Sequence, residues 1–321
     1  MRAPKMRTLA TMRYLSGAFA AWAAISACGG EPDASAEERA VGERGAPAAK
    51  DARVKDEAAK LSGELGALEA RAREALDAED VAEASRFIDR GVALAAGGDA
   101  AIEVARGRFV LLRGNIARDA GRTVDARRDY ADATALFRVR GDDRGRFEVF
   151  LAEAELEEIQ GDYAAAERQL AEAETLLPKI DDDRLRAAYR CRLGRLAFAR
   201  ARYADACTLF VDAVKLYSTA RAKRDQAETL LLLASAEDSG GNAPLARRSL
   251  DKALAIFDEI GDKDGEVRAL HRLAGFADRD HQYAKERSLL TKVRALYDEL
   301  GRRSDAVKVE RQLASLPESN E

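Results

Sequence analysis

The residues of this sequence best suited to metal binding or nucleophilic chemistry are two histidines, His271 and His281, and three cysteines, Cys28, Cys191 and Cys207. The histidines are ten residues apart, whereas two metal ligands on one face of a helix stand three or four residues apart. The sequence contains no HExxH, no CxxC and no glycine loop that could cradle a phosphate. It therefore predicts no enzyme, no metal and no other cofactor, and it leaves His271 as either an ordinary polar residue or a binding contact.

Repeated turn signals organise most of the chain. Five of them stand 40 residues apart, at Gly121, Gly161, Ala201, Gly241 and His281. At the second of these turns, Gly161 can end one helix with a positive φ, Asp162 can cap the next helix, and Tyr163 can pack at the junction. Each unit is therefore predicted to be a helical hairpin. A weaker copy between Val81 and Leu94 makes six hairpins.

Apolar residues recur in register after each turn. Two sets of small residues are Ala126, Ala166, Ala206 and Ala246, and then Ala133, Ala173, Ala213 and Ala253. Large residues follow at Leu136, Leu176, Leu216, Ile256 and Leu296, each with a further large residue after it. These spacings place them on one stripe of a helix, with small residues where two helices approach closely and large ones where the next repeat packs. Ser304 to Leu316 is predicted to be a final helix that covers the end of the array.

Cys191 and Cys207 fall in the two helices of one predicted hairpin. An oxidising compartment would permit a disulfide between them. Counted from the turn, the two cysteines are offset by about four residues, or roughly 6 Å along the helix pair. This offset favours two small buried apolar side chains over a disulfide.

The hairpin containing Leu193-Gly194, Tyr203, Ala206, Phe210 and Ala213 resembles the tetratricopeptide repeat (TPR) family. The resemblance implies an all-α protein, a right-handed α-solenoid of about six TPR-like helical hairpins plus a C-terminal capping helix. It would occupy residues 55–316, before a tail at 317–321. The unit of 40 residues exceeds the 34 of the standard repeat, and this resembles variants in bacterial regulators and in scaffolds that bind extended peptides.

In peptide-binding members of this family, residues of the first helix of each hairpin line a concave groove. Carrying these positions over selects ten candidate binding residues: Arg108, Leu111, Asn115, Arg118, Glu155, Arg192, Arg195, Phe198, Leu231 and His271. The carboxylate site with which some members bind chaperone tails needs a set of lysines and asparagines. Only Asn115 has a counterpart in that set, so that ligand is not indicated.

Two neighbouring first helices differ in charge. Glutamates crowd residues 148–158 and arginines crowd residues 184–202. One interpretation is a bipolar strip that binds an extended segment, because arginine takes carboxylates with two hydrogen bonds. The alternative is a ladder of ion pairs between repeats, and the sequence leaves both open.

The N-terminus is predicted to carry an export signal. A basic start precedes residues 14–27, which contain no charge and are shorter than the ~20 residues needed to span a bilayer. Ile25-Ser26-Ala27-Cys28 resembles the cleavage site of bacterial lipoproteins, which implies a signal peptide at 1–27 and a lipid on the sulfur of Cys28. Gly29 after the cysteine implies the outer membrane, facing the periplasm. Residues 28–54 are then the lipidated cysteine and a flexible tether, since 29–50 show no apolar period.

The charge balance gives no electrostatic reason to expect general nucleic-acid binding. The formal net charge of the whole chain is −4, and removal of four basic residues with the signal peptide would leave −8. Nucleic-acid affinity depends on lysine and arginine that neutralise phosphates. The predicted partners are proteins or peptides, with the membrane contacted through the lipid.

The combined prediction is a membrane-anchored TPR lipoprotein that acts as a protein- or peptide-binding scaffold in the cell envelope. Three alternatives remain open. The protein could be an assembly accessory of an outer-membrane secretin or pilus-type machine, a self-associating structural envelope protein, or, if the signal is misread, a cytoplasmic TPR regulator. The sequence fixes neither the partner nor the oligomeric state.

Overall fold

The computed structural model describes residues 34–96 and 100–317, with the side chains of 56–96 and 101–317. Regular secondary structure in these ranges is entirely helical. The chain divides into two units, residues 1–60 and 61–321, and each is considered by itself. The predicted signal peptide, Cys28 and residues 318–321 of the predicted tail lie outside the described ranges.

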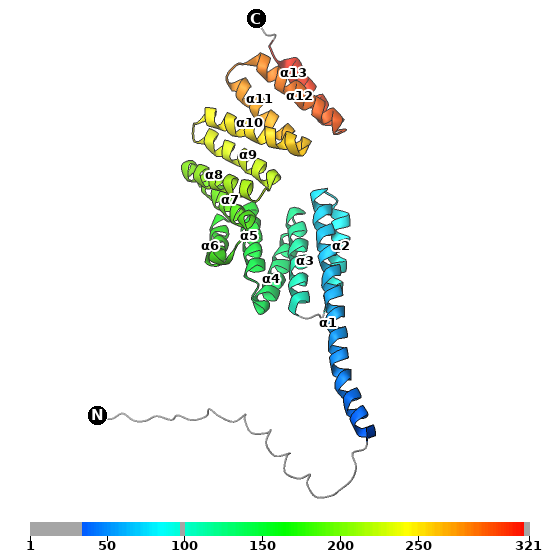
Figure 1. Cartoon of the computed structure of the whole chain (residues 1–321). Helices are drawn as coiled ribbons and strands as arrows, with labels where there is room; N and C mark the ends of the chain where they lie inside the picture. The colour runs from blue at the N-terminus through cyan, green and yellow to red at the C-terminus, as the bar shows by residue number, and fades with distance from the viewer. Residues whose placement is uncertain (1–33, 97–99, 318–321) are drawn as a thin grey trace, which may run out of the picture. The chain divides into compact units, whose positions relative to one another are not determined.

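The helices of the described ranges form six successive pairs and one further helix (Figure 1). The pairs are α1 (Ala34–Asp77) with α2 (Val81–Leu94), α3 (Ala100–Asp119) with α4 (Thr123–Arg140), α5 (Asp143–Gln160) with α6 (Tyr163–Leu176), α7 (Asp183–Ala199) with α8 (Tyr203–Thr219), α9 (Lys223–Ser239) with α10 (Ala243–Ile260), and α11 (Lys263–Arg279) with α12 (Tyr283–Glu299). A single 3-10 turn, η1 (Leu177–Lys179), separates α6 from α7. The final helix, α13 (Arg303–Ser315), is the predicted capping helix. The predicted all-α array of six hairpins and a cap is confirmed.

The unit of residues 1–60 contributes the first part of α1. This helix begins at Ala34, inside residues 28–54, which the sequence predicts to be the lipidated cysteine and a flexible tether. The segment is rich in alanine, glutamate, arginine and lysine, which have high helix propensity even without an apolar period. The prediction relied on a mixed composition without an apolar period and therefore gave no helix here.

In the unit of residues 61–321, a residue in the left-handed conformation ends most helices. The predicted turn residues all have positive φ: Gly121 +72°, Gly161 +76°, Ala201 +55°, Gly241 +82° and His281 +58°. The following N–H then bonds the carbonyl five positions earlier, as Arg202 does to Ala197 at 2.9 Å, and this satisfies a carbonyl that the helix end leaves free. Asp162 caps α6 as predicted, because its carboxylate accepts the N–H of Ala165 at 2.9 Å. The predicted helix-turn-helix units are confirmed at these turns.

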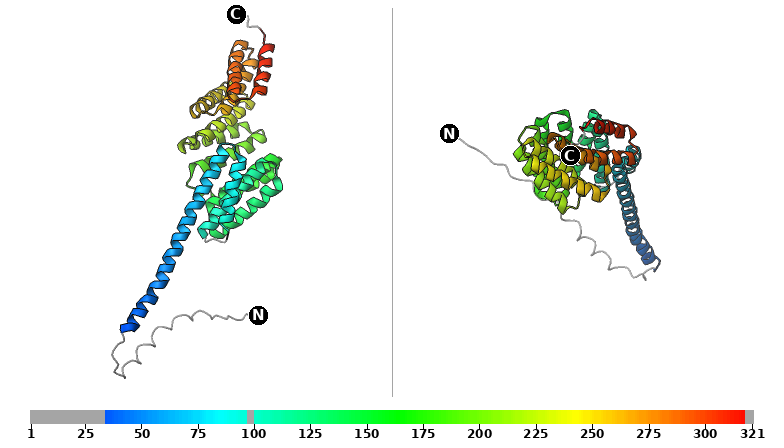
Figure 2. Two further views of the ribbon diagram at one scale, coloured as in Figure 1. Left: turned by 90° about the vertical axis from the view of Figure 1, so that its right-hand side faces the viewer. Right: turned by 90° about the horizontal axis from the view of Figure 1, so that it is seen from above.

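First and second helices of the pairs have different neighbours. Each first helix contacts the first helix of the next pair, from α3 to α5, α5 to α7, α7 to α9 and α9 to α11. Second helices contact the first helices on either side of them, as α8 does with α7 and α9. The pairs follow one another in the same order in both side views (Figures 1 and 2). The first helices therefore form one continuous face.

Buried alanines allow the helices to pack closely, both within a pair and between pairs. All eight alanines of the two predicted sets have an exposed fraction of 0%: Ala126, Ala133, Ala166, Ala173, Ala206, Ala213, Ala246 and Ala253. Of the large residues predicted to meet the next repeat, Leu176 is buried, whereas Leu216 is only half-buried. The residues one position later carry more of this packing, since Phe137 and Phe257 are fully buried.

Aromatic rings pack directly on glycines of neighbouring helices. Phe137 of α4 lies against Gly107 of α3 and Gly145 of α5, where an added Cβ would stand 2.6 Å from the ring in both cases. Gly194 of α7 faces Phe210 of α8 in the same way. A contact below 3 Å is not tolerated without movement of the ring or the helix, so these positions exclude even a methyl group.

Substitution of two glycines that both lie inside first helices tests this packing. In Gly194→Ala the new methyl would lie 2.7 Å from the buried ring of Phe210, and we expect the free energy of unfolding to fall by about 1 to 2 kcal/mol. In Gly275→Ala the methyl meets no atom within 4 Å, and the gain in helix propensity should raise stability by up to about 1 kcal/mol. Urea unfolding followed by circular dichroism measures both. Changes of the same sign in the two variants would contradict the packing argument.

Candidate binding surface along the first helices

The first-helix face, formed by α3, α5, α7, α9 and α11, carries most of the predicted binding residues. Four of them, together with Glu158, form a connected set of charges, which we call the ion-pair ladder: Arg118 of α3, Glu155 and Glu158 of α5, and Arg192 and Arg195 of α7. Glu155 accepts from Arg118 at 2.6 Å and from Arg192 at 2.5 Å, through the same Oε2 atom. Glu158 accepts from Arg195 Nε at 2.9 Å. The interpretation as ion pairs between repeats is confirmed for these residues.

The ladder is partly withdrawn from water. The side chains of Arg118, Glu155 and Arg192 are 11%, 23% and 20% exposed. Burial alone would raise the pKa of the Glu155 carboxyl, but Arg192 and Arg118 outweigh it and hold that pKa below its usual value. Burial dominates at Glu158 and raises its pKa despite Arg192 and Arg195. The charged groups of the ladder are therefore paired with one another. Arg195, whose side chain is 40% exposed, is the member most open to solvent.

Three other candidate residues contact side chains of the same helix pair or of the preceding one. Arg108 lies 3.7 Å from the carboxylate of Glu69 in α1. Asn115 accepts a hydrogen bond from the hydroxyl of Tyr130 at 2.9 Å. His271 lies beside Tyr297 of α12, with 3.5 Å between Nε2 and the hydroxyl oxygen, and burial lowers its pKa.

Two predicted groove residues are in the core. Leu111 and Leu231 are 5% and 3% exposed and belong to apolar clusters between helices, so their assignment to a binding groove is wrong. Leu232, the next residue after Leu231, faces the surface instead. A step of one residue rotates a side chain by about 100° around the helix axis, which is enough to exchange groove for core.

Cys191 and Cys207 are free thiols. Both are half-buried and pack against the apolar cluster of α7 to α11. The hydroxyl of Thr229 lies 4.0 Å from Cys191 Sγ, and burial raises the pKa of this thiol. The predicted interpretation as small apolar side chains agrees with this packing.

An apolar pocket of about 320 Å³ opens between α7 and α9. Its wall is mainly Phe198, Phe210 and Leu232, with Glu158 and Arg195 of the ladder at one side and Ser235 at the other. The ring of Phe198 lies at 5.6 Å from that of Tyr203, measured between centroids. Phe198 is therefore the predicted residue that remains available to an apolar ligand.

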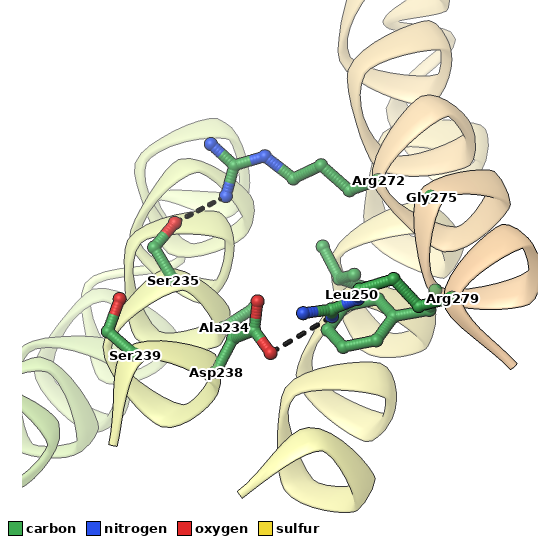
Figure 3. Close-up of a pocket in the computed structure, with 9 residues that line it drawn as sticks. Ala234, Ser235, Asp238, Ser239, Leu250, Arg272, Gly275 and Arg279 are labelled. Atoms are coloured by element: carbon green, nitrogen blue, oxygen red, sulfur yellow. Dashed lines mark hydrogen bonds and ion pairs between the residues drawn. The ribbon is translucent and has the colours of Figure 1, made fainter. Parts of the chain in front are cut away.

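An arginine pocket of about 410 Å³ follows between α9 and α11, and shares Ser235 with the apolar pocket (Figure 3). Arg272 and Arg279 project from α11 toward Ser235 and Asp238 of α9. Sequence reasoning missed these residues because it carried over His271, one position before Arg272. The spacing held a usable signal, because Arg272 stands 80 positions after Arg192.

A second acidic cluster lies on α5. Glu157 is 6% exposed and binds the guanidinium of Arg127 at 2.8 Å. Burial, together with the nearby Glu157 carboxylate, raises the pKa of Glu153 to about 7, and Arg127 opposes this only in part. Glu153 has no ion pair with another described residue and stays half-buried.

No protein-family model matches the chain, and no curated protein gives a significant match. Solved structures do match. A signal transduction ATPase with numerous domains (STAND) that has a tetratricopeptide repeat sensor, from Pyrococcus horikoshii, aligns with a TM-score of 0.61 and 16% identity over 75% of this chain and 35% of that one. The fold is a TPR-like α-solenoid.

Two further solenoids align comparably. A Rap protein complexed with competence and sporulation factor has a TM-score of 0.57 and 12% identity over 78% of this chain and 74% of that one. The Cut9–Hcn1 assembly of APC/C has a TM-score of 0.56 and 16% identity over 75% and 41%. This chain spans only about a third of the archaeal protein's length, and at these identities the likeness concerns the fold alone.

The raised pKa of Glu153 predicts a pH-dependent stability. Its folded-state pKa of about 7 lies above the usual value of 4.5, so the folded protein holds a proton that the unfolded chain has released. Stability should therefore fall as pH rises from about 4.5 to 7 and then level off. A shift of this size is worth about 3 kcal/mol when burial is complete, and residual solvent reduces it, so we expect Glu153→Gln to gain about 1 to 2 kcal/mol at pH 8 and almost nothing at pH 4.5.

Urea midpoints across this pH range provide the measurement. Glu172→Gln, at an exposed carboxylate of α6, is the matched control and should leave the profile of the wild type unchanged. A profile of Glu153→Gln parallel to that of the wild type would contradict the assignment.

Proposed function

We propose that this protein is a lipid-anchored binding scaffold of the bacterial cell envelope, built from TPR variants with a 40-residue unit, and that it binds extended protein or peptide segments on its first-helix face. The observation that carries this proposal is the pair of adjoining pockets between α7 and α11, which share Ser235. They form a surface with one apolar and one cationic part, as recognition of an extended segment by alternate side chains requires.

The position of the pockets supports a ligand on this face. Between α3 and α7 the first-helix face is occupied by the ion-pair ladder, in which each arginine is paired with a carboxylate. On α9 the polar side chains of Ser235 and Ser239 are short, and pockets open beside them. A partner segment can therefore gain buried apolar area and hydrogen bonds here without first breaking the ladder.

The anchor part of the proposal rests on the residues around Cys28. Ile25-Ser26-Ala27-Cys28 fits the processing site of lipoproteins, and Gly29 favours the outer membrane with the protein facing the periplasm. No helix of the described residues is long and apolar enough to cross a membrane. One acyl chain holds a protein weakly whereas two or more hold it stably, so a diacylglyceryl group on the sulfur would suffice to retain the scaffold.

Phase separation in detergent tests the anchor. We expect the full-length protein, expressed in a bacterium that processes lipoproteins, to enter the detergent phase and to incorporate a labelled fatty acid. Cys28→Ser should lose the label, whereas Cys191→Ser, at a half-buried thiol of α7, should keep it. Labelling that persists in Cys28→Ser would refute the anchor without bearing on the binding face.

Site-specific photocrosslinking in intact cells tests the binding face. A photoreactive residue at Ser239, on the rim of the arginine pocket, should give discrete crosslinks to partner proteins. The same residue at Val124, which is 81% exposed on the second helix α4, should give none of these. Phe198→Ala should weaken the crosslinks from position 239 because it removes a wall of the apolar pocket.

Crosslinks of equal strength from both positions would place the interface elsewhere. Reversal of Arg118, Arg192 and Arg195 to glutamate is unsuitable for this purpose, because it would leave Glu155 and Glu158 buried among like charges and disturb folding.

A further inference from the structure

We propose that the arginine pocket binds the carboxylate of an acidic side chain from the partner segment, with Arg272 as its principal ligand. This inference rests on the proposed function and specifies the chemistry of its ligand. It predicts that an aspartate or glutamate of the partner lies at the boundary of α9 and α11.

Arg272 is a cation without an anion. Its Nη1 donates to the carbonyl oxygen of Leu231 at 2.7 Å and to the hydroxyl of Ser235 at 2.6 Å (Figure 3). No carboxylate of the side chains that the structure describes forms an ion pair with it, since the nearby Glu228 is bound by Arg268 at 2.7 Å. Burial, with a contribution from Arg268, lowers the pKa of Arg272. The remaining N–H groups of its guanidinium are available to a carboxylate.

Comparison with the ion-pair ladder shows that Arg272 lacks the carboxylate partner that the ladder arginines have. Arg195 and Glu158 are separated by 37 residues, and so are Arg272 and Ser235. Glu155 also stands 37 positions before Arg192, the arginine that it binds at 2.5 Å. The same relation between two first helices therefore places a carboxylate beside Arg192 and only a hydroxyl beside Arg272. A ligand carboxylate would complete the contact that Glu155 makes within the chain.

Gly275 keeps the pocket open. It lies inside α11 on the pocket wall, and an added Cβ would meet no atom within 4 Å. Glycine inside a helix costs about 1 kcal/mol relative to alanine, and no aromatic ring needs the space here, in contrast to Gly194 or Gly265. The space that this glycine leaves is therefore part of the pocket, next to Arg272 and Phe276.

The charge of the pocket fits a carboxylate better than a phosphate. Arg279 is bound to Asp238 at 3.0 Å and is stacked on Phe276 with 4.2 Å to the ring centroid, so its charge is already balanced. One uncompensated positive charge remains, on Arg272. A phosphate with two negative charges would exceed it and would be repelled by Asp238.

Arginine side-chain resonances of the isotope-labelled full-length chain, carrying Cys28→Ser so that no lipid is attached, provide the test. The probes are the blocked single residues N-acetylglutamate methylamide and N-acetylglutamine methylamide. We expect the Nε–Hε signal of Arg272 to shift saturably with the glutamate probe and to respond at least about tenfold more weakly to the glutamine probe, as loss of a charged hydrogen-bond partner implies. The signal of Arg268, already paired with Glu228, should stay in place.

Three variants separate binding from folding. Gly275→Gln places a side chain in the open pocket, and we expect loss of the response with no fall in melting temperature. Gly63→Gln in α1, another helix glycine whose Cβ would meet nothing, is the matched control and should keep the response. Ser235→Glu supplies the missing carboxylate from within the chain and should abolish binding.

Equal responses to the two probes, no response at all, or an undiminished response in Gly275→Gln would overturn the carboxylate assignment. The scaffold proposal is judged separately. Crosslinks from position 239 without selectivity for the glutamate probe would leave the scaffold standing and remove the carboxylate site. Selective probe binding without crosslinks would keep the site and remove a partner on this face.

Discussion

Close contact between aromatic rings and helix glycines fixes the spacing on which the rest of this solenoid depends. Phe137 is held between glycines of α3 and α5, and so it ties together three consecutive helices across the boundary between two pairs. A ring with 0% exposure and no space for a methyl group allows few alternative separations. The buried alanines hold the same helices close at other points. Helices packed in this way bring successive first helices into direct contact, which a looser array would not do.

The ion-pair ladder depends on that contact. Glu155 reaches arginines on both neighbouring first helices at about hydrogen-bond distance, and a shift of one helix along its axis would break at least one of the two pairs. Partly buried ion pairs add little net stability, because desolvation offsets much of the attraction. They do penalise every register that leaves a charge unpaired. The ladder is therefore better understood as a device that fixes the alignment of α3, α5 and α7 than as a source of stability.

Sequence reasoning predicted the features that depend on local chemistry. The turn residue Gly161, the cap Asp162 and the buried alanines follow from φ preference, hydrogen bonding and size, and these act within a few residues. The residues of the binding face were harder to predict because they depend on the rotation of each helix about its axis. Leu231, chosen from the family pattern, lies in the core, whereas the next residue, Leu232, lines the apolar pocket. The ladder was recognised as one of two alternatives, but only the helix contacts decide which arginine meets which glutamate. The start of α1 was missed because propensity without amphipathicity gives no periodic signal.

At the proposed binding surface, selectivity would follow from the small residues more than from the arginines. Arginines occur along the first-helix face, at Arg118, Arg192, Arg195 and Arg272, and the three of the ladder are paired with glutamates of the neighbouring helix α5. What distinguishes the stretch from α9 to α11 is the absence of a long acidic side chain at Ser235 and of any side chain at Gly275. At the ladder arginines, a partner carboxylate would have to compete with the glutamates that already bind them. A carboxylate of the same chain is favoured in this competition because its effective concentration is higher. The proposed carboxylate site is therefore confined to the one arginine of these four for which the chain provides no carboxylate, because the ladder that aligns α3 to α7 already pairs the other three.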